Sequence, residues 1–97
     1  MTASLSTHVL DTAAGRPAAG VLVELHHGGA LVASGHTNED GRIAELAGGL
    51  APGLYELVFH PPSPFFRRVH LELDLPDGHH HVPLLVSPYG CASYRGS

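Results

Sequence analysis

The chain contains nine histidines among its 97 residues. The histidine side chain changes charge nearest neutral pH, with an ordinary pKa of about 6.5, and it is also the commonest metal ligand. Three histidines are consecutive, in the segment HHHVPLLV. Because side chains alternate along a strand, His79 and His81 would share one face while His80 points to the other. Two imidazoles placed in this way can converge on one substrate or one metal ion.

Two more candidate residues lie outside that segment. His8 stands in STHVLD, on the opposite face of its strand from the apolar residues, and Arg42 directly follows the Asp40-Gly41 turn. Taken singly, each pattern is more often structural than functional: a half-buried strand histidine, a solvated turn arginine, or histidines at a solvated sheet edge. The case for chemistry therefore depends on whether the fold brings these residues together.

Alternation with a period of two residues recurs along the whole chain, and no long helical pattern competes with it. In LSTHVL, Leu5, Thr7 and Val9 share one face; RRVHLELDL alternates apolar and polar residues even more regularly. Turns are expected at Asp-Gly, Gly-Gly and Pro-Gly. Pro83 lacks a backbone donor, which predicts that its strand is an edge or carries a bulge. The pattern predicts a single all-β domain over residues 1–97, a sandwich of seven or eight short strands with room for one short helix.

Composition narrows the function classes. The formal charge is −4, lysine is absent, and the five arginines are scattered except for Arg67 and Arg68, which argues against nucleic acid as a partner. No apolar segment approaches the length of about 18 residues that spanning a membrane needs, and the start carries no secretory pattern. A single cysteine, Cys91, fits a reducing compartment, so cytoplasmic localisation is expected. A core this small would gain stability from self-association.

Several segments taken together resemble the transthyretin-related 5-hydroxyisourate hydrolases. These are LSTHVLDTAAGRPAAGVLVEL, TNEDGR, GLYELVFH, HVPLLVSP and the final YRGS, which is the most specific of them. The similarity runs from about Leu5 to the last residue. It implies a transthyretin-like (prealbumin-like) β-sandwich and a homotetramer whose sites lie in a channel where subunits meet. It also implies a small-molecule substrate, 5-hydroxyisourate, with no cofactor, no metal, and neither nucleic acid nor membrane as a partner.

The resemblance also implies the site residues, carried over by motif. The implied catalytic residues are His8, Arg42, His81 and Ser97. The implied substrate-binding residues are His8, Arg42, Tyr94, Arg95, Gly96 and Ser97. On this view the chain stops abruptly at YRGS because its tail is part of the site.

The implied reaction opens the ring of 5-hydroxyisourate, in urate catabolism, by adding water to a ring carbonyl. The product is 2-oxo-4-hydroxy-4-carboxy-5-ureidoimidazoline. Such a reaction needs a base for the water and a cation or donor for the oxyanion. The base is either His8 or His81, with the other polarising the substrate or returning the proton. Arg42 would orient the substrate, Ser97 would bind through its hydroxyl or carboxylate, and Arg95 would anchor the tail.

The chain departs from the family pattern in three places. The segment between VFH and HVPLL is shorter than usual; Cys91, Ala92 and Ser93 replace a tyrosine, a serine and a threonine; and His80 replaces a common aromatic residue. With no cationic motif beside it, Cys91 is expected to be a packed thiol rather than a nucleophile.

Two other functions remain open from the sequence. His8, His79 and His81 could supply three nitrogen ligands to zinc or copper in a histidine-rich metal-binding sandwich. Alternatively, the chain could be a non-catalytic transthyretin-like module that binds a small ligand.

Overall fold

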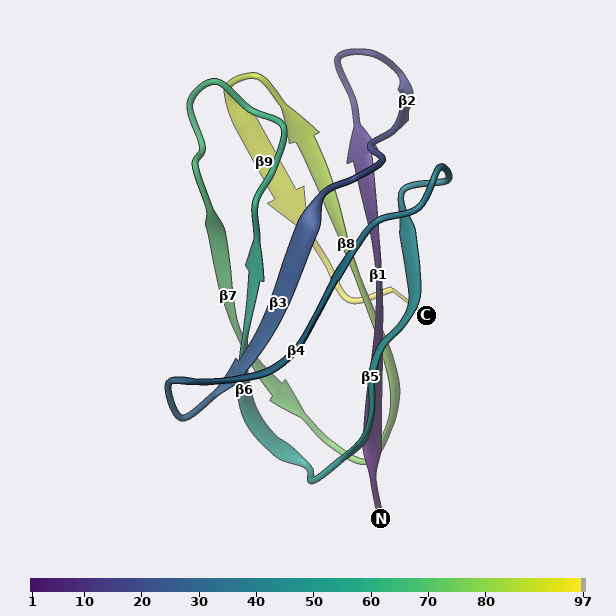
Figure 1. Ribbon diagram of the computed structural model, residues 1–97, viewed down its shortest axis with the longest axis vertical. Helices are drawn as coiled ribbons and strands as arrows, with labels where there is room; N and C mark the ends of the chain where they lie inside the picture. Colours follow the sequence, from purple (N-terminus) through teal and green to yellow (C-terminus); the bar gives the residue numbers. More distant parts are fainter. Residues whose placement is uncertain (97) are drawn as a thin grey trace.

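A computed structural model describes residues 1–96, which form nine strands in two facing sheets and no helix (Figure 1). The first sheet has the order β2-β1-β8-β9, and β5 also pairs with β1. Its strands are β1 (Ala3–Asp11), β2 (Arg16–Pro17), β5 (Arg42–Leu50), β8 (Gly78–Ser87) and β9 (Gly90–Ser93). The second sheet has the order β4-β3-β6-β7. Its strands are β3 (Leu22–His27), β4 (Ala30–His36), β6 (Gly53–Phe59) and β7 (Val69–Leu75).

The expected all-β sandwich is confirmed. The structure divides residues 1–96 into one or two more strands than expected, and β2 is only two residues long. The possible short helix is not found in residues 1–96, and the chain between β6 and β7, residues 60–68, contains only bends. Nowhere in residues 1–96 is there a helix that could cross a membrane.

The core lies between the two sheets and is built by alternate residues of the long strands. Eight of its apolar side chains are almost completely buried: Leu5, Val9, Val23, Leu25, Leu57, Phe59, Leu84 and Val86. The predicted alternation is confirmed in β1, where Leu5, Thr7 and Val9 are buried, and in β7, where the leucines face inward and the charged residues face solvent. Because side chains alternate, the buried face of β1 leaves its other face, with Ser4, Ser6 and His8, on the outside of the first sheet.

A parallel ladder between β1 and β8 joins the two ends of the chain. It pairs every residue of β1 with one of β8, including Ser4 with His79 and Ser6 with His81. Thr7 strengthens the ladder, because its buried hydroxyl donates to the carbonyl of Val82 at 2.6 Å. Residues that are 75 positions apart in the sequence therefore lie side by side on the outer face.

The prediction that Pro83 makes its strand an edge or gives it a bulge is wrong, because β8 lies between β1 and β9 and pairs with β1 without a shift of register. The ladder between β8 and β9 reaches Leu84 and Ser93, stops, and resumes in the same register where His81 pairs with Gly96. The carbonyl of His81 accepts from Gly96 at 2.7 Å, so Pro83, two residues further on, has its donor-less nitrogen on the same side of the strand. Pro83 thus interrupts the ladder locally without making β8 an edge strand.

A tight turn over residues 38–41 places Arg42 at the start of β5. The side chain of Asn38 accepts hydrogen bonds from the backbone nitrogens of Asp40 and Arg42, at 2.9 and 3.0 Å. Gly41 has a φ of 72° and donates to the carbonyl of Asn38, while its own carbonyl accepts from Val9 at 2.7 Å. The turn is therefore docked on β1, and Arg42 pairs directly with His8.

We expect Gly41→Ala to destabilise the protein more than Gly20→Ala does. Both glycines have a φ of 72°, and a left-handed conformation costs a non-glycine residue about 1 to 2 kcal/mol. At Gly20 a Cβ atom would meet nothing within 4 Å, whereas at Gly41 it would lie 2.5 Å from the carbonyl oxygen of Val9. Overpacking of this kind adds about 1 to 3 kcal/mol. Urea unfolding of both variants measures the difference, and equal losses would contradict a docked turn.

Candidate active site

The outer face of the first sheet carries two of the consecutive histidines, each bound to a serine of β1. The Ser6 hydroxyl lies 2.7 Å from Nδ1 of His81 and 3.0 Å from Nε2 of His79. The Ser4 hydroxyl lies 2.7 Å from Nδ1 of His79. Ser6 is buried, His81 is half-buried and His79 is exposed. Within residues 1–96 no hydrogen bond occupies Nε2 of His81, so this nitrogen is the one available for chemistry.

His8 is the next histidine on the same face of β1, beside Pro83 on one side and Arg42 on the other. Its Nε2 donates to the backbone carbonyl of Asp40 at 3.0 Å. Because a carbonyl only accepts, this bond places the proton of a neutral His8 on Nε2 and leaves a lone pair on Nδ1. The turn that positions Arg42 therefore also selects the tautomer of His8.

Arg42 and His81 approach the same region from opposite sides of β1. Residues directly opposite each other in an antiparallel pair point to the same face, so Arg42 lies on the face that carries His8. Burial lowers the pKa of His81, and the positive charges of Arg42, His8 and His79 lower that pKa further. The imidazole of His81 is accordingly held in its neutral form at pH values where an ordinary histidine begins to take up a proton.

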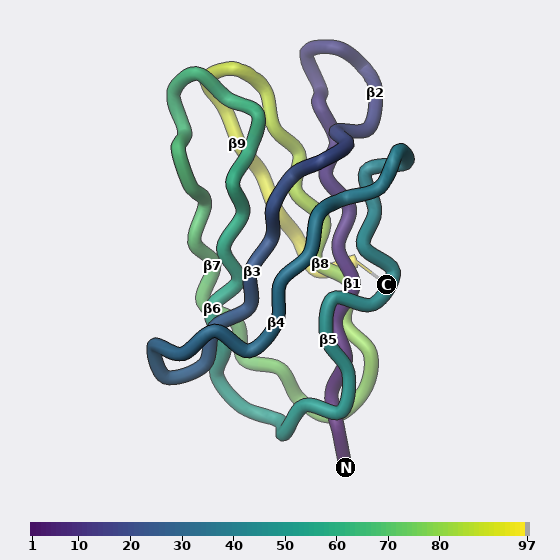
Figure 2. Tube along the Cα trace, in the orientation of Figure 1, coloured from purple at the N-terminus to yellow at the C-terminus, as the bar shows by residue number. Residues whose placement is uncertain are grey.

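The chain after β9 returns to this face. In Figure 2 it leaves the end of β9 and runs beside β8, where Gly96 bridges His81. A Cβ atom on Gly96 would lie 2.6 Å from Cδ2 of the His81 ring and 3.1 Å from its carbonyl oxygen. Only glycine permits so close an approach between the tail and the imidazole.

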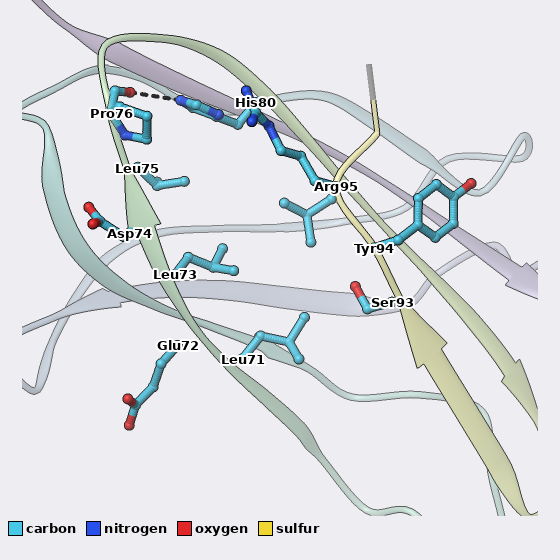
Figure 3. Close-up of a pocket in the computed structure, with 11 residues that line it drawn as sticks. Leu71, Glu72, Leu73, Asp74, Leu75, Pro76, His80, Ser93, Tyr94 and Arg95 are labelled. Atoms are coloured by element: carbon cyan, nitrogen blue, oxygen red, sulfur yellow. Dashed lines mark hydrogen bonds between the residues drawn. The ribbon is translucent and has the colours of Figure 1, made fainter.

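Tyr94 and Arg95 belong to the same tail but line a different cavity. This cavity, of about 330 Å³, lies between β7 and the tail, and its apolar wall includes Leu71 and Leu73. Figure 3 shows Arg95 extending toward His80, whose Nε2 donates to the carbonyl of Pro76 at 2.7 Å. His8, Arg42 and His81 do not line this cavity. A single chain thus brings four of the expected residues together, namely His8, Arg42, His81 and Gly96, and holds Tyr94 and Arg95 apart from them. Ser97, the remaining expected residue, lies outside the described part.

Several other histidines pair with glutamates on the second sheet. Nε2 of His60 lies 3.0 Å from Oε1 of Glu24, and Nε2 of His26 lies 3.7 Å from the same oxygen. The hydrogen bond from His60 is the main cause that lowers the pKa of Glu24. His70 pairs with Glu56 at 3.4 Å. The side chains of these pairs are exposed or half-buried.

The metal-binding alternative required three ligands to converge. Over residues 1–96, no group of three or more histidine, cysteine, aspartate or glutamate side chains has an arrangement that could hold a metal ion. His79 and His81 instead share the hydroxyl of Ser6. The expectation of a packed thiol is wrong, because Cys91 is exposed on β9. Partial burial nevertheless raises the pKa of this thiol, which disfavours the nucleophilic thiolate.

Sequence reasoning missed Ser4 and Ser6 as site residues. The alternation of β1 placed Ser6 on the same face as His8, but no local pattern shows that β1 pairs with β8 or in which register. Over residues 1–96, the assembled face has a guanidinium beside two imidazoles, each with one ring nitrogen that makes no hydrogen bond. It can therefore move a proton and stabilise developing negative charge on a planar polar molecule.

Comparison with known proteins gives a consistent match over nearly the whole chain. The sequence profile of the HIUase/Transthyretin family matches residues 5–96. A relative from Rhizobium meliloti named 5-hydroxyisourate hydrolase 2 is 44% identical, over an alignment that covers 96% of this chain and 95% of the relative. That alignment spans 115 positions whereas this chain has 97 residues, so the relative carries segments that this chain lacks.

Solved structures agree with the sequence match. The structure of Klebsiella pneumoniae 5-hydroxyisourate hydrolase has a TM-score of 0.90 and is 36% identical, covering 98% of this chain and 99% of its own. Sea bream transthyretin in complex with thyroxine has a TM-score of 0.85 and covers 95% of this chain and 93% of its own. At 24% identity, the second comparison shows that the fold is shared and nothing more.

We expect Arg42→Gln to raise the pKa of His81, because the substitution removes a positive charge that opposes the imidazolium form. The pKa is measured by following the His81 ring resonances by NMR as the pH changes. Arg16→Gln is the matched control: it removes the same charge from β2, on the same sheet, where Arg16 is not among the groups that shift His81. An unchanged His81 pKa in Arg42→Gln would show that the guanidinium does not act on this ring.

Proposed function

Because the chain belongs to the HIUase/Transthyretin family, we propose that it is a 5-hydroxyisourate hydrolase acting in urate degradation, a branch of purine catabolism. The observation that carries this proposal is the meeting of His8, Arg42, His81 and Gly96 on one sheet face. The names and near-complete coverage of the relatives support the same activity. The proposed reaction adds water to a ring carbonyl, breaks the adjacent carbon–nitrogen bond and leaves a carboxylate and a ureido nitrogen.

His81 is the proposed general base. Its lowered pKa favours the neutral ring, and when Nδ1–H donates to the Ser6 hydroxyl, Nε2 carries the lone pair. This nitrogen takes a proton from the attacking water and later gives one to the leaving ring nitrogen. A positioned acid–base group of this kind contributes about 10² to 10⁴-fold to the rate.

His8 and Arg42 are the proposed partners of the base. The lone pair on Nδ1 of His8 accepts a hydrogen bond from an N–H group of the substrate, since Nε2 is held by Asp40. The planar guanidinium of Arg42 offers two parallel donors to neighbouring carbonyl oxygens. It orients the flat substrate and stabilises the negative charge that forms on the attacked carbonyl.

The tail completes the proposed site. Gly96 lies against the His81 ring, which brings the C-terminal segment to the reacting region. Ser97 follows directly and is proposed to bind the substrate through its hydroxyl or a carboxylate. Tyr94 and Arg95 are proposed to bind substrate only in the assembled protein, since in one chain they line the cavity beside His80.

The proposed assembly is a homotetramer in the cytoplasm. His8 and His81 are half-buried and Arg42 is exposed on a sheet face that is open in the single chain. A hydrolytic site gains from walls that exclude bulk water, because charges act more strongly where water is excluded. A second subunit placed over this face would supply those walls and form the channel.

We expect His81→Ala to lower kcat/KM by about 10² to 10⁴-fold, because it removes the proposed base. Arg42→Ala should cost about 10² to 10³-fold through the loss of charge stabilisation. We expect His8→Ala to be impaired as well, and all three variants to remain folded.

The assay follows the ultraviolet decay of 5-hydroxyisourate made in situ from urate, with the uncatalysed decay as the baseline. His36→Gln, on the second sheet, is the control. Near wild-type rates in two of the three site variants would contradict the assignment.

We expect Gly96→Ala to reduce turnover with little loss of stability. The added methyl group would displace either the tail or the His81 ring, and a misplacement of about 1 Å can cost 10²-fold in rate. Gly90→Ala on β9 is the matched control, because its Cβ atom would meet only the movable Ser87 hydroxyl, at 3.1 Å. Turnover and urea unfolding are measured for both variants. Full activity in Gly96→Ala would show that the tail contact is not needed.

A further inference from the structure

A hydrogen-bonded chain runs from His81 to the exposed end of the sheet face. It passes from Nδ1 of His81 to the Ser6 hydroxyl, then to Nε2 of His79, and from Nδ1 of His79 to the Ser4 hydroxyl. The three contacts measure 2.7, 3.0 and 2.7 Å. Both nitrogens of the His79 ring are engaged, and neither serine nor His79 belongs to the proposed substrate-binding set.

The shared hydroxyl of Ser6 couples the two imidazoles. A serine has one proton to donate, so when both rings are neutral Ser6 donates to one and accepts from the other. If Nδ1–H of His81 donates to Ser6, then Ser6 donates to Nε2 of His79, and Nδ1–H of His79 donates to Ser4. In this arrangement Nε2 of His81 is unprotonated and ready to act as a base. The reverse polarity puts the proton of His81 on Nε2, ready to act as an acid.

We infer that Ser6 and His79 form a proton relay behind His81 and that His79 holds the positive charge while the reaction proceeds. When Nε2 of His81 takes a proton from water, Nδ1 of His81 releases one to Ser6, and Ser6 releases its own to Nε2 of His79. His81 is then neutral with a proton on Nε2, and His79 is an imidazolium. When Nε2–H protonates the leaving nitrogen, the two transfers run backward and restore the starting state. One proton has moved from water to the leaving nitrogen, with none gained or lost.

The surroundings favour transfer of the charge away from His81. Burial and the charges of Arg42 from β5 and His8 from β1 oppose an imidazolium at His81, and the tail presents an uncharged glycine there. His79 is exposed, so water can stabilise the same charge at that position. Ser4 accepts from Nδ1–H of His79 both before and after the transfer, so no contact has to break.

This inference rests on the proposed hydrolysis, so its first test uses no substrate. Nitrogen NMR of the wild-type protein, with ¹⁵N-labelled histidine, reports the tautomer of each neutral ring. We expect His79 and His81 to show the same tautomer, with the proton on Nδ1, and Ser6→Ala to remove that correlation. Opposite tautomers in the wild-type protein would overturn the relay, because Ser6 cannot then connect the two rings.

The second test separates proton transfer from simple positioning. In His79→Gln, the side-chain amide can still donate a hydrogen bond to one serine and accept one from the other. The amide cannot take up a proton, however. We expect it to lower kcat by about tenfold or more, within the range of acid–base effects, with little change in KM. Imidazole added to the solution should restore turnover in His79→Ala, because it can occupy the place of the missing ring. It should not restore turnover in the double variant Ser6→Ala/His79→Ala, because the added imidazole can exchange protons with His81 only through the Ser6 hydroxyl.

Two outcomes would overturn the relay while leaving the proposed hydrolysis intact. The first is that His79→Gln has the kcat and the pH profile of the wild-type protein. The second is that imidazole restores turnover equally in His79→Ala and in the double variant with Ser6→Ala. Failure of the wild-type protein itself to accelerate the decay of 5-hydroxyisourate would reject the proposed hydrolysis instead. His36→Gln, which removes an exposed histidine from β4, should match the wild-type protein in every assay.

Discussion

The parallel ladder between β1 and β8 fixes the positions of the other strands and of the site residues. It joins the first strand to one near the end of the chain, and it sets the outer-face side chains of both strands in rows. The inner faces of the same strands supply Leu5, Val9, Leu84 and Val86 to the core. Slipping the register by one residue would turn an entire strand over. Burial of the inner face therefore also maintains the contacts between serines and histidines on the outer face.

The remaining parts of the site are placed by reference to that ladder. The turn over residues 38–41 docks on the opposite side of β1, so that Arg42 and His8 become direct neighbours. The tail reaches His81 because the ladder with β9 resumes at Gly96 after the break at Pro83. The arginine, the tail and both histidines thus depend on backbone pairing, and backbone pairing is more rigid than contacts between long side chains.

One residue type performs several tasks in this molecule because its surroundings differ. His80 is buried and bound to a backbone carbonyl, His60 forms a hydrogen bond with Glu24, and burial and nearby positive charge favour the neutral form of His81. His79 differs from His81 chiefly in its exposure, although the two rings share the hydroxyl of Ser6. An abundance of histidine in the composition therefore says little until the environment of each ring is known.

Residue patterns along the chain were enough to predict the features that depend on a few neighbouring residues. Alternation with a period of two identified the strands and their buried faces, Asp40-Gly41 marked the turn before Arg42, and the motifs pointed to His8 and His81. Which strands are neighbours could be seen only in the folded chain. The tertiary structure placed β8 inside the sheet despite Pro83, brought Ser6 to His81, and directed Arg95 toward a different cavity. The physical reason is that alternation follows from local backbone geometry. Pairing between residues 75 positions apart depends instead on how both sheets together bury their apolar faces.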